Sequence, residues 1–319
     1  MNTNENYNSL KLDSSCCNLK NKKIIITGAS GFIGSSVKKL LERFGCKILT
    51  IGRNANEDFT IDLKNTKLLQ IISNFSPHIV CHFASGTNIA RANENKEKEY
   101  SDTIMGTKNL IHSFTKVQTK PEKIIYLSSQ SVYGISEILP VSESALLNPV
   151  TVYGENKLRA EELIRGSNFN YIIFRISSVY GAQQNPHKSG VIAKFISRLR
   201  INQSPIVFNS FDFFSDFIYI SDVANAIVLS LGIVPLNKSK IYNLGLGKPT
   251  TLKRILEILY KYFPGAPTPV LETNSQYIDS KGLYLDISKI QKELSWKCKY
   301  DIESGIKDML QGLKIPEKI

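Results

Sequence analysis

Short apolar runs alternate with amphipathic stretches along most of the chain. The runs 24–26 and 124–127 are apolar on successive positions, as expected for strands that are covered on both faces. Amphipathic stretches with helical spacing lie between such runs. Strands are predicted at 23–27, 47–51, 59–61, 78–83, 123–128 and 171–176, and helices at 32–44, 66–73, 102–115 and 153–165.

Strands and helices that alternate in this way imply right-handed crossovers and a parallel sheet. We therefore predict an α/β fold, a Rossmann-type doubly wound parallel sheet with a smaller C-terminal α+β domain. After residue 180 the pattern loosens, with helices predicted at 222–231 and 251–263, capped by Ser221 and Thr250, and a last helix at 302–313. The predicted parts are a disordered tail at 1–21, a Rossmann domain at 22–180 and 217–247, and a second domain at 181–216 and 248–319.

Composition narrows the class of protein and of ligand. The chain has 319 residues, 42% hydrophobic and 21% charged, which is typical of one large or two modest globular domains. Forty Lys and Arg residues against 28 Asp and Glu give a net charge of +12, which favours either an acidic ligand or simply a charged, solubilising surface. The lysines are scattered and no nucleic-acid-binding motif occurs, so a phosphorylated small molecule is expected rather than nucleic acid.

Several other classes of site and location are not expected. The apolar runs are far shorter than the roughly 18 residues of a membrane helix, and residues 1–22 are too polar for a secretory signal, so a cytoplasmic location is predicted. Five cysteines without a Cys-x-x-Cys pair indicate reduced thiols. Four histidines show no metal-ligand spacing, and no metal is predicted.

A glycine loop, 27–34, follows the first predicted strand and opens a helix with Gly-x-x-Gly-x-x-Gly spacing. Glycines at such a place present unobstructed backbone N–H groups and the positive end of a helix to a pyrophosphate. The alternative is a tight turn that needs positive φ. The residues predicted to contact a dinucleotide here are Gly28, Ser30, Gly31, Phe32, Ile33 and Gly34.

The end of the second strand bears on the choice of cofactor. An acidic residue about 20 positions after the loop would bind a ribose 2′-hydroxyl and favour NAD, but Gly52 stands there and Arg53 follows it. A cation without a carboxylate favours the 2′-phosphate of NADP, with NAD left open. Arg53 could also be an ordinary solvated residue. Asp62 could accept from the adenine amino group or cap a turn.

A tyrosine, a lysine and a serine form the candidate catalytic group. Tyr153 and Lys157 lie four residues apart at the start of a predicted helix, so both side chains share one face. Lysine there could stabilise a phenolate and lower the pKa of the tyrosine. Ser129 ends the preceding strand at the carboxyl edge of the sheet, where its hydroxyl could bind a reacting oxygen. Turn capping is the alternative role of this serine.

These motifs together resemble the extended short-chain dehydrogenase/reductase family, in its branch of nucleotide-sugar epimerases, dehydratases and reductases. The resemblance runs from residue 22 to about 313. The motifs that carry it are 27–34, 82–85, 106–110, 128–134, 153–157, 175–181, 216–223, 242–247 and 286–289.

The resemblance implies a role for each part. Tyr153 would be the acid/base, Lys157 would also hold the nicotinamide ribose, and Ser129 would bind the reacting oxygen. Further cofactor contacts are predicted at Arg53, Asp62, Leu63, Phe83, Ala84 and Ser85. The C-terminal α+β domain would be the substrate domain and would hold a nucleoside-diphosphate sugar, typically an intermediate of surface-polysaccharide synthesis.

The chain departs from the pattern of the family at three places. Gln130 and Ser131 replace the Asp-Glu pair of dehydratases, which argues against dehydration. Ser215 stands where an arginine usually binds the sugar diphosphate, and Ser178 where relatives often carry asparagine. Lys188, Lys194 or Lys281 could replace the arginine, and the residues predicted to contact substrate are Gln130, Ser178 and Lys194.

The favoured prediction is an NADPH-dependent reductase of a keto-deoxy nucleotide sugar. Within the family the alternative is a sugar 4-epimerase that oxidises and re-reduces its substrate on tightly held NAD. A non-catalytic nucleotide-sensing protein is an alternative of another class. A homodimer is left open.

Overall fold

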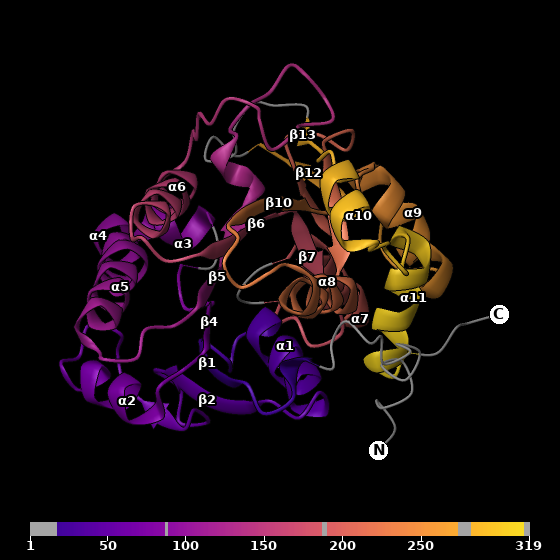
Figure 1. The fold of residues 1–319 in the computed structure, drawn as a ribbon. Coiled ribbons are helices and arrows are strands. Elements are labelled where there is room, and N and C mark those ends of the chain that lie inside the picture. Colours follow the sequence, from indigo (N-terminus) through magenta and orange to yellow (C-terminus); the bar gives the residue numbers. More distant parts are fainter. Residues whose placement is uncertain (1–17, 87–88, 187–189, 274–281, 316–319) are drawn as a thin grey trace.

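The computed structural model describes residues 18–86, 89–186, 190–273 and 282–315. A parallel sheet of seven strands runs through the molecule in the order β10-β6-β5-β4-β1-β2-β3 (Figure 1). Between β1 and β4 the order reverses, because the chain first builds outward through β2 and β3 and then returns to the other side of β1. The predicted doubly wound sheet is confirmed. Its strands are β1 (Lys23–Thr27), β2 (Lys47–Gly52), β3 (Phe59–Thr60), β4 (Ile79–His82), β5 (Lys123–Ser129), β6 (Tyr171–Ile176) and β10 (Lys240–Leu244).

Helices cover both faces of this sheet (Figure 1). One face carries α1 (Phe32–Arg43), α8 (Ile220–Ile233) and α10 (Ser288–Leu294). The other carries α2 (Lys67–Phe75), α5 (Gly106–Lys116) and α6 (Val152–Arg165). Successive residues of β1 therefore enter different cores, Ile24 and Ile26 on the α1 face and Ile25 on the α2 face. This two-sided burial explains why the strand is apolar at successive positions.

Short elements follow the carboxyl ends of β4 and β5. They are α3 (Ile89–Glu94), α4 (Lys96–Tyr100), the π-helix η2 (Ser101–Met105) and the 3₁₀ helix η3 (Gln130–Val132). The helix predicted at 102–115 is thus divided into η2 and α5.

The rest of the chain forms a smaller region with its own apolar core. Strand β9 pairs there with β7, β11 and β13, and β8 pairs with β12. The elements of this region are β7 (Ser178–Tyr180), α7 (Val191–Arg200), β8 (Ile206–Phe208), β9 (Phe214–Tyr219), β11 (Pro249–Thr251), α9 (Leu252–Tyr262), β12 (Val270–Glu272), β13 (Gly282–Leu283) and α11 (Ile302–Gly312). Residues 178–180, which were expected in the first domain, thus pair with β9. The domain boundaries stay a prediction.

The predictions for two helix caps were wrong. Tyr219 is the N-cap of α8, because β9 runs directly into this helix and Ser221 lies inside the first turn. Thr251, one residue after the predicted Thr250, caps α9 by accepting a hydrogen bond from the N–H of Arg254.

The fold also begins earlier than residue 22. Leu19 is only 1% exposed and packs in the core beneath α1, and the Asn18 side chain donates to the carbonyl of Gly232 at 3.2 Å. Residues 18–21 therefore belong to the folded body, whereas 1–17 lie outside the described residues, where the tail stays a prediction.

Candidate active site

The glycine loop between β1 and α1 is shaped by close backbone approach. Gly28 has φ +73°, and a Cβ there would lie 2.9 Å from the backbone nitrogen of Ala84. A Cβ on Gly34 would collide with the carbonyl oxygen of Gly28. Within the described residues no side chain caps α1 at Gly31 and no acidic residue lies in its first turn. The loop therefore presents the positive end of a helix without obstruction, which fits the pyrophosphate of a dinucleotide.

The structure brings a carboxylate to the end of β2, where the sequence places none. The Glu57 side chain lies over Gly52, where a Cβ would be only 3.1 Å from its Oε1. That oxygen accepts a hydrogen bond of 2.7 Å from the N–H of Ser30 in the glycine loop. The inference that this place has no acid was wrong, because the acid arrives from the following loop.

Arg53 is already paired with acids. Its Nη1 lies 2.9 Å from Asp102 Oδ1 and 3.9 Å from Asp62 Oδ2, and its side chain is 57% exposed. Asp62 also accepts from the N–H of Lys64 at 2.9 Å, so it caps its own turn. The structure therefore places neither residue as a free partner for NADP or adenine, and both contacts stay predictions.

The segment after β4 borders the glycine loop. Phe83 and Ala84 donate their N–H groups to Thr27 Oγ1 at 3.2 Å each, which ties this segment to β1. Ser85 Oγ accepts from the ammonium of Lys157 at 2.7 Å. Leu63 is buried. The dinucleotide contacts predicted at Leu63, Phe83, Ala84 and Ser85 stay predictions.

Ser129 and Tyr153 meet at the carboxyl end of β5. Ser129 Oγ accepts from the N–H of Ser131 at 3.1 Å and so caps η3. It also hydrogen-bonds the hydroxyl of Tyr153. Thr151 caps α6, and a Cβ on Gly154 would lie 2.5 Å from the carbonyl oxygen of Ser131. Glycine at 154 thus allows α6 to approach η3 and bring Tyr153 to Ser129.

Lys157 lies one turn further along α6 with its ammonium held in place. Its Nζ donates to Ser85 Oγ at 2.7 Å and to the carbonyl of Leu127 at 2.8 Å, and lies 5.6 Å from the ring centroid of Tyr153. Burial lowers the pKa of Lys157 to about 8, against the opposing effect of Glu99 and Glu161. The three predicted catalytic side chains are thus brought together.

The expected lowering of the tyrosine pKa is not what the free protein shows. Burial raises the pKa of Tyr153 to about 12, and the charge of Glu99 acts in the same direction, while the hydrogen bond from Ser129 opposes it. Tyr153 therefore carries its proton at neutral pH. A bound cation beside the phenol would favour the phenolate instead.

Glu99 is a buried acid near the site that sequence reasoning missed. It is 6% exposed at the end of α4, and its Oε1 accepts from Thr103 Oγ1 at 3.0 Å. Burial raises its pKa. Glu99 lies in the sequence Lys-Glu-Lys-Glu-Tyr, which has the composition of a solvated helix and gives no signal of this burial.

Three neutral polar side chains gather beside Ser129. Gln130 Nε2 donates to Ser215 Oγ at 3.2 Å, and Ser215 Oγ lies 3.2 Å from Ser178 Oγ. Gln130 Oε1 is buried and has no hydrogen-bond partner among the described residues, so it can accept from a ligand hydroxyl. Lys194 is exposed on α7, and its contact with substrate stays a prediction; Lys188 and Lys281 lie outside the described residues.

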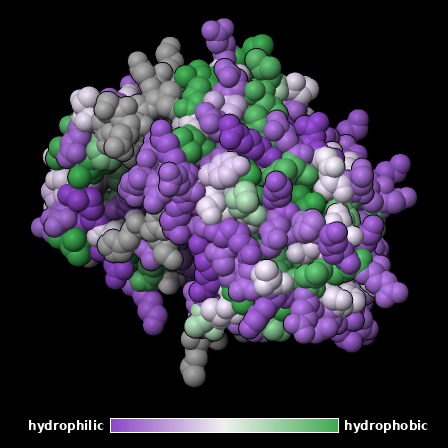
Figure 2. Space-filling model, turned by 90° about the vertical axis from the view of Figure 1, so that its left-hand side faces the viewer, coloured by the Kyte–Doolittle hydropathy of each residue, from purple (hydrophilic) through white to green (hydrophobic). Residues whose placement is uncertain are grey.

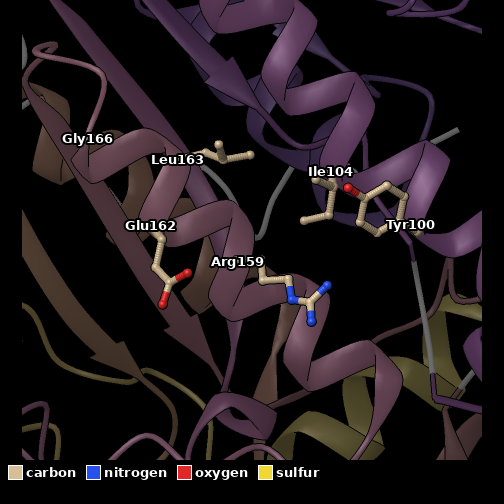
Figure 3. A pocket seen from close by; sticks show the side chains of 6 residues that line it. All are labelled: Tyr100, Ile104, Arg159, Glu162, Leu163 and Gly166. Carbon is tan, nitrogen blue, oxygen red and sulfur yellow. The ribbon is translucent and has the colours of Figure 1, made fainter.

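A shallow, open pocket of about 440 Å³ lies elsewhere, between α6 and the end of α4 with η2. Figure 3 shows Tyr100 and Ile104 facing Arg159 across it. Neither Ser129, Tyr153 nor Lys157 lines it. Figure 2 faces the side of the molecule that lies to the left in Figure 1, and this surface is mainly hydrophilic with scattered hydrophobic residues.

Two further observations concern the described residues only. No group of three or more His, Cys, Asp or Glu side chains there is placed to hold a metal ion. None of the helices in the same ranges combines the length and the apolar character needed to cross a membrane.

Known proteins with similar sequences act on nucleotide sugars. A putative UDP-glucose 4-epimerase of Methanocaldococcus jannaschii is 33% identical over 307 residues, covering 91% of this chain and 98% of that protein. A dTDP-4-dehydro-6-deoxyglucose reductase of Escherichia coli is 27% identical over 320 residues, covering 91% and 97%.

Solved structures share the fold. The UDP-glucose 4-epimerase of Thermotoga maritima with UDP-glucose superposes with a TM-score of 0.84 at 23% identity, covering 92% of this chain and 98% of that one. The UDP-glucuronic acid 4-epimerase of Bacillus cereus, in complex with UDP-glucuronic acid and NAD, gives 0.82 at 24% identity, covering 92% and 99%.

A family model matches most of the chain directly. It is described as the NAD dependent epimerase/dehydratase family and covers residues 24–245, from β1 through β10 and therefore across the glycine loop, Ser129, Tyr153 and Lys157. The resemblance inferred from the motifs is confirmed, and the chain is an NAD(P)-dependent nucleotide-sugar enzyme that belongs to the NAD dependent epimerase/dehydratase family.

Proposed function

We propose that this protein is an NAD-dependent 4-epimerase of a nucleoside-diphosphate hexose. The observation that carries the proposal is the hydrogen-bonded pair Ser129–Tyr153, with Lys157 beside it, at the strand ends that adjoin the glycine loop. The relatives named as 4-epimerases favour inversion at C4. The proposal therefore takes up the 4-epimerase, which was the alternative in the sequence analysis, in place of the favoured reductase.

The residues of the chain can hold the reacting atoms and move the proton. The dinucleotide, when bound, supplies an acceptor and later a donor of hydride. Ser129 would hold the sugar oxygen. Tyr153, as the phenolate that a bound cation favours, would take the proton of that oxygen while hydride leaves C4. The same tyrosine returns the proton when hydride comes back to the opposite face of C4, so no net oxidation or reduction occurs. Lys157 holds the nicotinamide ribose.

We further propose that Gln130, Ser178 and Ser215 contact the sugar. All three are uncharged and already connected by hydrogen bonds. Gln130 Oε1 is an acceptor that has no partner among the described residues. Hydroxyl groups are suitable partners for such a set.

Incubation with a panel of nucleoside-diphosphate hexoses and a stoichiometric amount of NAD, followed by NMR of the products, tests the proposal. We expect a C4 epimer to accumulate to equilibrium with no net change in NADH absorbance and no solvent deuterium at C4. The Tyr153→Phe protein is the matched control. A 4-keto-6-deoxy product would show dehydration instead, for which Gln130 and Ser131 lack the acid and base.

Reduction of a keto-deoxy sugar nucleotide is the second candidate. The relative named as a dTDP-4-dehydro-6-deoxyglucose reductase favours it. NADPH or NADH consumed in equal amount to an added keto sugar would identify this activity and overturn the epimerase. A place in surface-polysaccharide synthesis, a cytoplasmic location and a homodimer stay predictions.

A further inference from the structure

The side chain of Glu57 is fixed where β2 meets the glycine loop. Its Oε1 accepts from the N–H of Ser30 at 2.7 Å. The whole residue is only 7% exposed. Its other oxygen, Oε2, is buried and has no hydrogen-bond partner among the described residues. A buried carboxylate oxygen without a donor calls for a ligand that supplies one.

The loop that carries Glu57 is held by the strand itself. Asp58 Oδ2 accepts from the N–H of Thr50 at 2.8 Å and from its hydroxyl at 3.0 Å. The N–H of Asp58 donates back to Thr50 Oγ1 at 2.8 Å, and that of Glu57 donates to the carbonyl of Asn54. The carboxylate is therefore preorganised against β2.

Gly52 makes room for this arrangement. A Cβ at position 52 would lie 3.1 to 3.3 Å from Glu57 Oε1, Cγ and Cδ, tighter than ordinary van der Waals contact. Position 52, which would ordinarily carry the acid, thus has no side chain. The Glu57 carboxylate reaches the same end of β2 from the loop that follows the strand.

We propose that Glu57 selects NAD over NADP by accepting hydrogen bonds from the adenosine ribose hydroxyls through Oε2. This inference rests on the proposed dinucleotide site and identifies which dinucleotide it takes. A 2′-phosphate would bring about 1.5 to 2 negative charges against a buried carboxylate, in a place where solvent screening is weak. Charge repulsion there disfavours NADP.

Arg53 does not compensate for this repulsion. Its guanidinium is shared between Asp102 and Asp62, whose carboxylates would compete with a phosphate. Its side chain is also largely exposed, so its attraction is screened.

Isothermal titration of the full chain with NAD, NADP, ADP-ribose and 2′-phospho-ADP-ribose tests the proposal without any turnover. We expect the parent protein to bind NAD at least about tenfold more tightly than NADP, with the same order for the two ribose probes. Glu57→Gln keeps the side-chain shape and an acceptor for Ser30, but removes the charge, so it should reduce the preference severalfold. Glu57→Ala should weaken NAD binding as well.

Glu42→Gln is the matched control, because it makes the same substitution at an exposed acid on α1 and should leave the preference for NAD unchanged. Circular dichroism of each variant checks folding. Tighter binding of NADP by the parent, or an unchanged preference in a folded Glu57→Gln protein, would overturn the role of Glu57 while leaving the dinucleotide site intact. Binding of neither dinucleotide would overturn the proposed function together with this inference.

Discussion

Single side chains determine what the site can do. Tyr153 is the proton carrier that lies against Ser129, and its pKa of about 12 in the free protein keeps it protonated until a charge nearby changes the balance. Other tyrosines in Val-Tyr-Gly sequences are buried elsewhere. Tyr133 hydrogen-bonds Asn243 and Tyr180 hydrogen-bonds the carbonyl of Asp301. Neither has a lysine four residues later.

The Tyr153→Phe substitution should lower kcat by about a hundredfold or more, because it removes a positioned proton carrier and little volume. NAD affinity should change little. Steady-state kinetics, with NAD binding measured separately, checks both. Tyr180→Phe is the control and should retain parent turnover, whereas near-parent turnover in Tyr153→Phe would disprove the assignment.

At the scale of elements, close backbone contacts hold the glycine loop and the strand ends in place. The glycine loop depends on residues without a Cβ. Strand β5 is held differently, because it starts at the buried Lys123. Lys123 donates from Nζ to the carbonyls of Val234 at 3.2 Å and Pro235 at 2.5 Å, and so ties this strand to the end of α8.

Gly34→Ala should abolish dinucleotide binding, because the new Cβ would collide with the carbonyl oxygen of Gly28 and displace the loop. Titration calorimetry with NAD gives the measurement. Gly106→Ala, at the start of α5, is the matched control and should keep the NAD affinity of the parent. A Cβ at position 106 would make only ordinary van der Waals contacts with Leu63, at 3.7 and 3.8 Å. Parent-like NAD affinity in Gly34→Ala would contradict this account of the loop.

Lys123 should make stability depend on pH in alkali. Burial lowers its pKa in the folded protein from 10.5 to about 8. Between these values the unfolded chain binds more protons, so the unfolding free energy contributed by this group rises with pH. Urea unfolding measures the unfolding free energy of the parent and of Lys123→Met. As the pH rises from about 8 to 10.5, this free energy should increase in the parent relative to the variant, by up to about 3 kcal/mol. A constant difference would refute the shift.

At the scale of the whole molecule, a buried ion pair connects segments that lie far apart in the sequence. Arg175 on β6 binds Glu161 on α6, with Nη2 2.8 Å from Oε2, and neither side chain is more than 2% exposed. Nη1 of the same arginine reaches the hydroxyl of Tyr133 at 3.2 Å and the carbonyl of Glu143 at 3.1 Å. One side chain thus connects the sheet, the helix that carries Tyr153 and Lys157, and the segment after η3.

Glu161→Gln should reduce the unfolding free energy by roughly 3 to 5 kcal/mol, since it leaves a buried guanidinium without its counter-charge. Chemical denaturation measures this loss. Glu303, which is exposed and pairs with Lys261 and Arg254, supplies the control, because Glu303→Gln should cost at most about 1 kcal/mol. Equal losses in the two variants would contradict the structural role of the buried pair.

The sequence predicted the parts that depend on local pattern. Successive apolar residues located β1 and β5 to within one residue. Tyr7–Lys11 and Tyr277–Lys281 have the same spacing as Tyr153–Lys157, and only the place of the last pair, at the start of the helix after β5, distinguished it. Contacts across space were missed: Glu57 reaches back to Gly52 from a polar loop, and Glu99 is buried from a lysine-rich helix. Periodicity carries no information about either, because both side chains are placed by folding of neighbouring segments.

The contact between Gly52 and Glu57 also carries an evolutionary constraint. The two positions share one space, so a side chain larger than hydrogen at 52 would press against the inward-folded glutamate at 57 and displace it. We expect the two positions to change together across homologues: an acidic residue at 52 should accompany loss of the acid at 57, and glycine at 52 should accompany its retention. An alignment in which positions 52 and 57 vary independently would contradict this expectation, because an acid at one position would then not replace an acid at the other.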